Sequence, residues 1–476
     1  MSYSDLYLLV DGERLGAAGR RTIPVVNPAT GETLGELPLA SFADLERALE
    51  ATRKAWPVWR ALGPQARGKI LHKAADLLRE RSEALARLAT LEMGKTLPET
   101  RIELGHAAEI FDWYAEEGRR AYGRVLPQRV PGMRMTVVKE PVGPVAGFAP
   151  WNFPLGNPAR KLGAPLGAGC SVILKPAEES PASALAVAQA LLDAGVPPGA
   201  VQVVFGVPAE VSRQLIASPV IRAVHFTGSI PVGKELTQLA AAGMKRTTME
   251  LGGHAPVLVF DDVDVDAVLD MAVPAKFRNA GQVCVSPTRF YVHEAVYGRF
   301  AAGFAGRAQK FRVGNGLEEG VRMGPLAHAR RRPAVAGLIE DAVRGGARVL
   351  AGGHAIEGAG YFHAPTVLAD VPETTRIMNE EPFGPVAVLR PFREFDEAVA
   401  AANRLPYGLA AYAFTNNARR VNLLGEQVEA GMLGINSFTI AMPEAPFGGV
   451  KESGHGSEEG IEGLEACLVT KFITES

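Results

Sequence analysis

The chain uses cysteine sparingly: Cys170, Cys284 and Cys467 are the only three among its 476 residues. An odd number of cysteines so far apart provides no disulfide framework and is typical of a protein from a reducing compartment. The first residues, MSYSDLYLLVDGERLG, reach an acidic residue before an apolar run long enough for a secretion signal. We therefore expect a cytoplasmic protein.

Charge of one sign and long apolar segments are missing too. Fifty Lys and Arg face 52 Asp and Glu, which leaves a net charge of −2 and no overall positive field to attract nucleic acid or an anionic membrane. The longest uncharged stretch, residues 141–159, contains five prolines, which prevent a membrane-spanning helix. We expect a small molecule as the ligand, and neither nucleic acid nor a membrane as a partner.

Two kinds of binding motif are also absent. The nine histidines and three cysteines form no HxxxH or CxxC pair, so we expect no metal site. The dinucleotide pattern GxGxxG after a strand is missing, because Gly167 and Gly169 precede their strand and lack the third glycine. A standard Rossmann phosphate turn is therefore not supported.

The spacing of apolar residues divides the chain into regions. Spacings of three and four over residues 42–121 predict a layer of amphipathic helices. From residue 141, short β-branched runs alternate with helical segments, and a second alternation begins at residue 256. This pattern predicts two α/β domains, each with a doubly wound parallel sheet. We expect residues 1–124 with 141–249 to form the first domain and residues 250–445 to form the second.

Two segments fit neither sheet. Residues 125–140 resemble a hairpin, and residues 446–476 end in a strand with no obvious partner in its own domain. Because unpaired strands are usually covered, we expect these segments to form a small β element that contacts another subunit. The protein is therefore predicted to be a homo-oligomer, either a dimer or a tetramer.

Three residues are candidates for catalysis. Cys284 lies in a loop with small or polar neighbours, where catalytic groups concentrate; the alternative is a small core residue. Glu250 ends a strand just before a glycine pair, and Asn152 lies in the proline-rich loop APWNFP. Cys170 heads an apolar strand and Cys467 lies in the tail, so we predict structural roles for both.

Two turns are candidates for nucleotide binding. In HFTGSIPVG, residues 225–233, Gly228 and Ser229 stand between a strand and a helix, where free backbone N–H groups can bind phosphate. In KPAE, residues 175–178, Lys175 and Glu178 follow a strand and could bind the hydroxyls of an adenosine ribose. The alternatives are an ordinary strand-to-helix turn and a surface lysine beside a helix-capping glutamate.

Seven motifs occur in one order: WNFP, KPAE, FTGS, ELGG, GQVC, EEPFGPV and PFGGVKESG, between residues 151 and 454. In this order and spacing the chain resembles the NAD(P)-dependent aldehyde dehydrogenase superfamily over nearly its whole length. FDWYAEEGRRAYG (111–123) and KFRNAGQVCV (276–285) are most similar to its succinate-semialdehyde dehydrogenase branch. The resemblance implies that the first domain binds NAD, the second is catalytic, and the segments 125–140 and 446–476 serve in oligomerisation.

The same resemblance implies a reaction through a thioester. Cys284 would add to the aldehyde carbonyl, while the Asn152 amide and the Cys284 N–H stabilise the oxyanion. After hydride transfer, Glu250 would activate the water that hydrolyses the thioester. Lys175 belongs with these three residues in the implied catalytic set.

The resemblance also implies a set of cofactor contacts. Lys175 and Glu178 would bind the adenosine ribose, and Gly228 and Ser229 would face the pyrophosphate. Glu178 favours NAD over NADP, because its carboxylate would repel the additional phosphate. The other contacts implied are Pro150, Trp151, Leu251, Glu381 at the nicotinamide ribose and Phe383 beside the nicotinamide.

Arg160 and Arg278 match two arginines with which the semialdehyde branch is thought to clamp a carboxylate. Such a pair suits an ω-carboxylated aldehyde such as succinate semialdehyde, whereas the alternative for each arginine is a structural salt bridge. Phe447 is a further implied substrate contact. Met442 stands where that branch tends to have a small hydroxyl residue, which suggests room for a longer or more apolar aldehyde.

Two further departures from the family pattern and three alternatives remain. Ser286 stands where relatives often carry a second cysteine, and Ile230 and Pro231 replace the family's usual Thr-Glu at the phosphate turn. One alternative is an enzyme with a broader aromatic or aliphatic aldehyde range. The second is a CoA-acylating aldehyde dehydrogenase, which generally lacks the base at Glu250, and the third is a non-catalytic structural relative.

Overall fold

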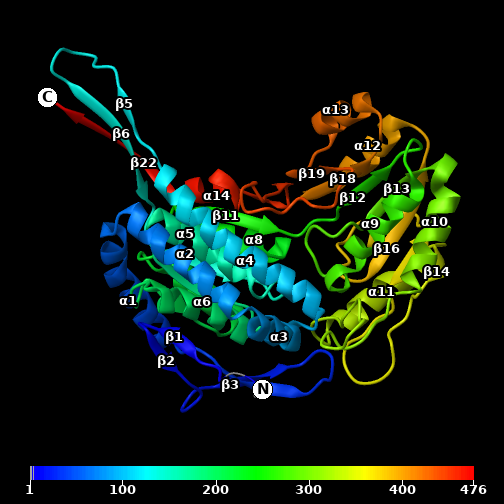
Figure 1. The fold of residues 1–476 in the computed structure, drawn as a ribbon, viewed down its shortest axis with the longest axis horizontal. Helices are drawn as coiled ribbons and strands as arrows, with labels where there is room; N and C mark the ends of the chain where they lie inside the picture. Colours follow the sequence, from blue (N-terminus) through cyan, green and yellow to red (C-terminus); the bar gives the residue numbers. More distant parts are fainter. Residues whose placement is uncertain (1–2, 4) are drawn as a thin grey trace.

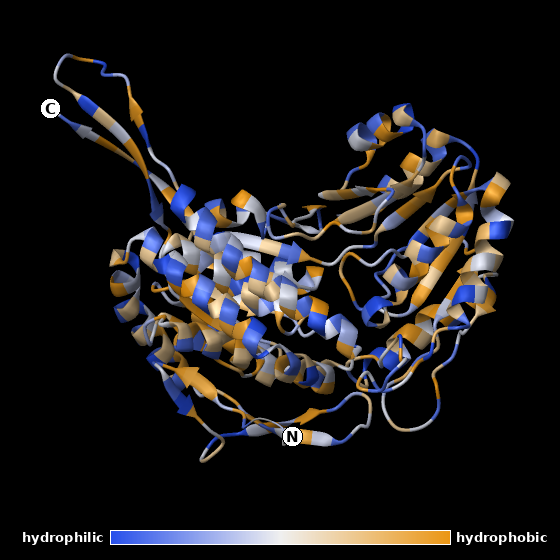
Figure 2. Ribbon diagram, viewed as in Figure 1, coloured by the Kyte–Doolittle hydropathy of each residue, from blue (hydrophilic) through white to orange (hydrophobic). Residues whose placement is uncertain are grey.

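Two α/β units lie side by side, and a narrow β arm projects from one of them (Figure 1). The computed structural model describes residue 3 and residues 5–476. Each unit has its own sheet and its own buried apolar cluster, and Figure 2 shows apolar residues concentrated in the strands inside each unit. The predicted class, two doubly wound α/β sheets with a small additional β element, is confirmed.

The first sheet has eight strands in the order β2-β1-β9-β8-β7-β10-β11-β21. Its five central strands are parallel, and β1, β2 and β21 pair antiparallel at the edges. Helices α6 and α7 begin with Pro181 and Pro208, at a position where the missing N–H costs no helical bond. The strands are β1 (Leu8–Val10), β2 (Glu13–Leu15), β7 (Val145–Ala149), β8 (Val172–Pro176), β9 (Val201–Val203), β10 (Ala223–Gly228), β11 (Arg246–Leu251) and β21 (Gly454–His455), and the connecting helices are α5 (Gly156–Ala168), α6 (Pro181–Ala194), α7 (Pro208–Ala217) and α8 (Ile230–Ala242).

The helical layer predicted for residues 42–121 packs on this first unit. Ser41 and Thr96 begin two of its helices with capping boxes, in which side chain and backbone satisfy each other's free donors. The layer consists of α1 (Phe42–Ala61), α2 (Pro64–Glu80), α3 (Ser82–Met93), α4 (Leu97–Glu117) and the short η1 (Gly118–Arg120).

The second sheet has seven strands in the order β14-β15-β16-β13-β12-β18-β19. All neighbours are parallel except β14 at one edge. The strands are β12 (Pro256–Val259), β13 (Arg289–His293), β14 (Arg348–Ala351), β15 (Thr366–Ala369), β16 (Val386–Phe392), β18 (Ala410–Phe414) and β19 (Met432–Ile435), and the helices are α9 (Val265–Phe277), η2 (Arg278–Gly281), α10 (Glu294–Ala308), α11 (Arg331–Arg344), η3 (Arg376–Met378), α12 (Phe395–Asn403) and α13 (Ala418–Gln427).

The arm is a three-stranded sheet that contains the predicted hairpin. β5 (Arg124–Leu126) pairs antiparallel with β6 (Arg134–Pro141), which confirms the hairpin. The tail strand β22 (Leu468–Glu475), which follows α14 (Gly460–Ala466), pairs with β6 over its whole length. The sequence showed no partner for the tail strand because the two strands lie more than 300 residues apart, yet the same chain supplies one.

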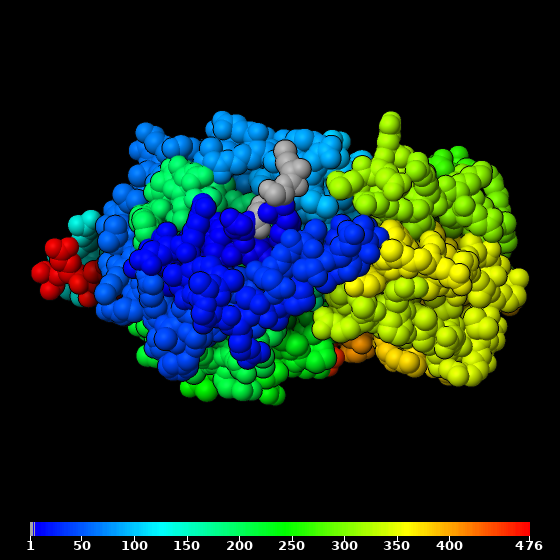
Figure 3. Space-filling view, turned by 90° about the horizontal axis from the view of Figure 1, so that it is seen from below, coloured from blue at the N-terminus to red at the C-terminus, as the bar shows by residue number. Residues whose placement is uncertain are grey.

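The N-terminal segment joins the two units. β3 (Thr22–Val26) pairs with β4 (Thr33–Pro38), and in Figure 3 this dark-blue segment crosses the underside of the first unit to reach the yellow part of the second. The backbone N–H of Tyr361 donates to the Pro28 carbonyl over 2.9 Å. A two-stranded sheet of β17 (Tyr407–Gly408) and β20 (Val450–Lys451) ties the C-terminal segment to the second unit. Over residue 3 and residues 5–476, none of the helices combines the length and apolarity needed to cross a membrane.

Candidate active site

The loop that carries Cys284 follows η2 and has an unusual backbone. Asn279 and Ala280 both adopt positive φ, 52° and 53°, which non-glycine residues rarely do. At Gly281 a Cβ atom would lie 2.0 Å from the Gly384 carbonyl oxygen, so only glycine fits there. This backbone leaves the Cys284 side chain partly exposed, whereas Cys170 and Cys467 are buried.

Asn152 lies against the cysteine loop. Its Nδ2 donates to the Gln282 carbonyl over 3.1 Å, and its Oδ1 accepts from Asn157 Nδ2 over 3.1 Å. One N–H of the amide is therefore used for orientation, and the second remains to donate elsewhere. Gln282 stands two residues before Cys284 in the chain. The structure therefore places the Asn152 amide beside the cysteine loop, where an oxyanion donor is required.

A buried ion pair behind Asn152 was not found from the sequence. Lys95 Nζ donates to Glu103 Oε2 over 2.6 Å and to the Asn152 carbonyl over 2.7 Å. Glu103 in turn accepts from the N–H groups of Leu155 and Gly156, over 2.8 and 3.0 Å. The helical layer thereby fixes the loop that presents the Asn152 amide.

Glu250, the second-last residue of β11, is a buried carboxyl group whose oxygens are unpaired among the described residues. Only 1% of the residue is exposed, and neither oxygen has a hydrogen-bond partner among the residues that the structure describes. Burial raises the pKa of Glu250 well above its usual range, while the charges of Lys161 and Arg160 oppose that rise. An unpaired carboxyl group of this kind suits a general base, because its oxygens are free to accept a hydrogen bond from water.

Two consecutive cations face two consecutive carboxylates beside Glu250. Lys161 on α5 bonds Glu458 and Thr227, and Arg160 Nε donates to Glu459 Oε1 over 2.8 Å. Sequence reasoning missed Lys161, Glu458 and Glu459. The available signals were the position of Arg160 and Lys161 directly after the uncharged stretch 141–159 and the two adjacent acids within the glycine-rich GHGSEEG.

The Cys284 thiol is only partly exposed to solvent. Burial raises its pKa to about 12, and the charge of Arg160 acts in the opposite direction. The positive charge of Arg160 lowers the pKa of both Cys284 and Glu250, so this one guanidinium stabilises the anionic form of each group.

The two arginines predicted to clamp substrate occupy different environments. Arg160 stacks on the Phe447 ring, with 4.2 Å between its guanidinium carbon and the ring centroid. Arg278 is exposed and lies 5.8 Å from the Phe153 ring centroid; it has no ion-pair partner within the described ranges. The structural salt bridge is therefore realised for Arg160, whereas Arg278 has none among the residues that the structure describes and is a free cation near the cysteine loop.

The predicted phosphate turn has the form of an anion site. Ser229 precedes α8 without a capping bond from its side chain, and Pro231 leaves the N–H groups of Ile230 and Val232 as free donors of the first turn. At Gly228 a Cβ would lie 2.4 Å from the Phe226 ring. These residues fit a pyrophosphate group.

The predicted ribose contacts also come together. Lys175 Nζ lies 2.6 Å from Glu178 Oε1, at the carboxyl end of β8. The Gly206 N–H donates to the same carboxylate oxygen over 3.3 Å. An ammonium and a carboxylate side by side can each bond one hydroxyl of a ribose.

The remaining cofactor candidates come from both units: Pro150, Trp151 and Leu251 from the first, and Glu381 and Phe383 from the second. Trp151 and Phe383 make an edge-to-face contact at 5.5 Å, and Pro150 directly follows β7. Glu381 Oε1 accepts from the Gly253 N–H over 3.3 Å, and burial raises the pKa of Glu381 to about 7. Leu251, at the end of β11, packs closely on Gly233: a Cβ atom at position 233 would lie 2.4 Å from the Leu251 side chain.

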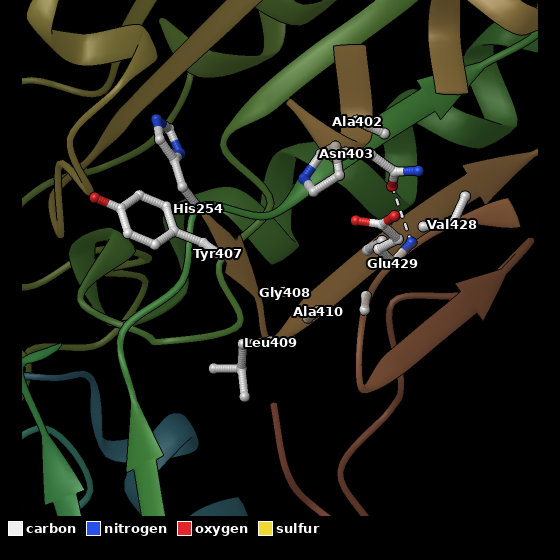
Figure 4. Close-up of a pocket in the computed structure, with 12 residues that line it drawn as sticks. His254, Ala402, Asn403, Tyr407, Gly408, Leu409, Ala410, Val428 and Glu429 are labelled. Carbon is white, nitrogen blue, oxygen red and sulfur yellow. Dashed lines mark hydrogen bonds between the residues drawn. The ribbon is translucent and has the colours of Figure 1, made fainter. Parts of the chain in front are cut away.

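A small cavity elsewhere does not belong to this group of residues. It is lined by residues around His254, Tyr407, Asn403 and Glu429, and the Glu429 N–H donates to Asn403 Oδ1 over 2.9 Å (Figure 4). None of the predicted catalytic or cofactor residues lines it. In the part of the chain that the structure describes, no three His, Cys, Asp or Glu residues are grouped to hold a metal ion.

Comparison with known proteins decides the family. A sequence profile of the aldehyde dehydrogenase family matches residues 16–473. The chain belongs to this family. The resemblance read from the seven motifs is thereby confirmed.

Several aldehyde dehydrogenase relatives match along nearly the whole chain. The 4-(hydroxymethyl)benzenesulfonate dehydrogenase TsaD1 of Comamonas testosteroni is 53% identical over 466 residues, 98% of this chain and 97% of that protein. The NADP(+)-type succinate-semialdehyde dehydrogenase GabD of Escherichia coli is 42% identical over 465 residues, 98% of this chain and 96% of that protein. The crystal structure of succinate-semialdehyde dehydrogenase from Burkholderia pseudomallei superimposes with a TM-score of 0.97 at 41% identity and covers 100% of both chains.

Proposed function

We propose that this aldehyde dehydrogenase uses NAD to oxidise an aldehyde that carries an anionic group at its far end, with succinate semialdehyde as the first candidate. The observation that carries the proposal is the position of Arg160, whose charge acts on both Cys284 and Glu250. A guanidinium this close to the nucleophile can bind the far end of a short anionic aldehyde.

The reaction that we propose divides the work among three residues. The Cys284 thiolate adds to the carbonyl carbon and forms a thiohemiacetal oxyanion, which accepts hydrogen bonds from the free N–H of Asn152 and from the Cys284 N–H. A bound nicotinamide supplies the hydride acceptor. Glu250 then takes a proton from water, which attacks the thioester and releases the acid and the thiol.

The preference for NAD rests on Glu178. Its carboxylate pairs with Lys175 at 2.6 Å and is held further by the Gly206 N–H. A 2′-phosphate would have to approach this carboxylate, which repels it. The related GabD is named as an NADP(+) enzyme, so cofactor choice needs a direct measurement.

A second candidate is an aromatic aldehyde with an anionic group. TsaD1, at 53% identity, is named for 4-(hydroxymethyl)benzenesulfonate, and oxidation of that alcohol gives a flat aldehyde with a sulfonate at the opposite end. Aromatic side chains in this region support it, because Phe438 contacts Tyr412 at 4.8 Å and Tyr412 bonds the Val285 carbonyl. The apolar Met442 also suits a larger substrate.

Steady-state kinetics on matched aldehydes test the proposal. Succinate semialdehyde is compared with butanal, and 4-formylbenzenesulfonate with benzaldehyde, each with NAD and NADP. We expect kcat/KM to be at least about 10-fold higher for one anionic aldehyde than for its uncharged match, since one such hydrogen-bonded ion pair is worth about 1.4 kcal/mol or more. Equal kcat/KM within both pairs would refute the anionic substrate, and a strict requirement for CoA would refute hydrolysis by Glu250.

A further inference from the structure

The backbone of Glu459 has a conformation that glycine normally occupies. Its φ is 57° and its ψ is −179°, a combination found almost only in glycine because a side chain meets its own backbone there. The next residue is a glycine, Gly460, with φ 59°. Strain of this kind persists only where other contacts hold the residue, and it concentrates at functional sites.

The Glu459 side chain is buried between an arginine and a histidine. Its Oε1 accepts from Arg160 Nε over 2.8 Å and lies 2.7 Å from His106 Nε2. Its side chain is 0% exposed, and among the residues described its Oε2 has no hydrogen-bond partner. The strained backbone thus places a carboxylate where it bonds one particular edge of Arg160.

The edge that Glu459 bonds determines which atoms of Arg160 remain available. The face of the guanidinium lies on the Phe447 ring at 4.2 Å, and Nε is bonded to Glu459. No group in residue 3 or residues 5–476 bonds Nη1 or Nη2. Gly448, next to Phe447, lies against Glu250: a Cβ atom at position 448 would be 3.3 Å from Glu250 Oε1. Nη1 and Nη2 are therefore two free donors at the end of the Arg160 guanidinium, near the reacting groups.

We propose that Glu459 is a positioning residue that holds Arg160 so that Nη1 and Nη2 together bind a two-oxygen anionic group, a carboxylate or sulfonate, on the substrate. This inference rests on the proposed function. The Arg160 guanidinium is already held at Nε and on one face, so it loses little conformational freedom when it binds a ligand. This favours an anion that accepts two parallel hydrogen bonds. Because Glu459 balances the charge of Arg160, the pair supplies directed donors, whereas exposed Arg278 supplies uncompensated charge.

Two variants of Glu459 and one control test the proposal. Glu459→Gly removes the tether and suits the positive φ, so its backbone is not a source of misfolding. Glu459→Gln keeps an oxygen that can accept from Arg160 Nε. Glu462→Gln changes an exposed residue of helix α14, which directly follows Glu459, and is the matched control. KM and kcat are measured for succinate semialdehyde and 4-formylbenzenesulfonate, and for butanal and benzaldehyde.

The expected result separates anion binding from folding. Glu459→Gly should raise KM for the preferred anionic aldehyde about 10-fold, with kcat and the constants for uncharged aldehydes unchanged within about two-fold. Glu459→Gln should give a smaller rise, of about three-fold, and Glu462→Gln should give none. In an Arg160→Ala background, Glu459→Gly should add nothing further.

Each contrary result has a defined meaning. A wild-type protein without preference for anionic aldehydes overturns both this inference and the proposed function. A clear preference that Glu459→Gly and Glu459→Gln leave intact overturns only the role of Glu459. Equal losses for anionic and uncharged aldehydes would show a structural role and would also overturn it.

Discussion

Lys161 and Glu458 form a buried ion pair that joins α5 to the C-terminal segment beside Glu250. Burial lowers the pKa of Lys161 to about 7, and the charge of Glu250 acts in the opposite direction. The proton affinities of Lys161 and Glu250 are therefore linked, although 89 residues separate them in the chain.

This ion pair gives a first prediction, on hydrolysis. Lys161→Met removes a charge that lowers the pKa of Glu250, so hydrolysis at neutral pH should slow and acyl-enzyme should accumulate, seen as a burst of NADH. The same variant leaves the buried Glu458 without its ion-pair partner and should lose about 3–5 kcal/mol of stability. The double variant Lys161→Met/Glu458→Gln should recover stability but not the rate. A double variant with wild-type turnover would contradict the link.

A second prediction concerns the nucleophile. Cys284→Ala should abolish NADH production and leave NAD binding intact, because the thiol is needed only for the covalent step. Cys467→Ala, a buried cysteine outside the site, is the matched control and should retain turnover. Asn152→Ala should lower kcat by about 10² to 10³. Activity in Cys284→Ala would refute the assignment.

A third prediction concerns pH. Because the Cys284 pKa is raised to about 12, the thiolate fraction, and with it the rate of alkylation by iodoacetamide, should rise throughout the range from pH 7 to 10. Arg160 lowers this pKa, so Arg160→Met should shift the profile to higher pH, whereas Arg160→Lys, which keeps the charge, should shift it less. Peptide mass spectrometry identifies the alkylated cysteine. A profile unchanged in Arg160→Met would show that this charge does not reach the thiol.

A fourth prediction concerns cofactor choice. Glu178→Ser removes the carboxylate beside Lys175, so the ratio of kcat/KM for NADP to that for NAD should rise by about 10-fold or more. Glu179, the half-buried partner of another ion pair, accepts from the exposed Arg330 over 2.9 Å and provides the control Glu179→Gln. If Glu178→Ser leaves the ratio unchanged, another residue selects the cofactor.

A fifth prediction concerns the arm. Val125, Phe472 and Ile473 are 73%, 56% and 42% exposed on β5 and β22, and exposed apolar side chains along sheet edges are typical of interfaces. We therefore propose that the arm joins copies of the chain. Phe472→Asp should lower the mass measured by light scattering, while Thr474→Asp on the same strand should change it less. A monomeric wild-type protein would contradict this prediction.

The fold was largely predictable because its signals are local. β-branched runs and helix-starting prolines such as Pro181 and Pro208 lie within a few residues of what they specify. The tail strand was not assigned a partner, because β22 meets β6 across 327 or more residues, and nothing local identifies such a match.

The residues of the candidate site likewise fall into those that local motifs identify and those that depend on distant contacts. Cys284, Asn152 and Glu250 lie in short motifs and could be selected from the sequence. Lys95, Lys161 and Glu459 could not, since their function depends on contacts with Asn152, Glu458 and Arg160 that lie 57, 297 and 299 residues away. A charged residue is ordinarily solvated, and only the folded chain shows which ones are buried.

Phe447, Glu458 and Glu459 stand within the last 30 residues of the chain, yet they complete a site whose proposed catalytic residues lie between Asn152 and Cys284. During synthesis on the ribosome, both sheets can therefore begin to form long before Arg160 and Lys161 find their carboxylates. A chain that is cut short by a premature stop or trimmed at its C-terminus would keep its thiol but lack the groups that balance the charges around it.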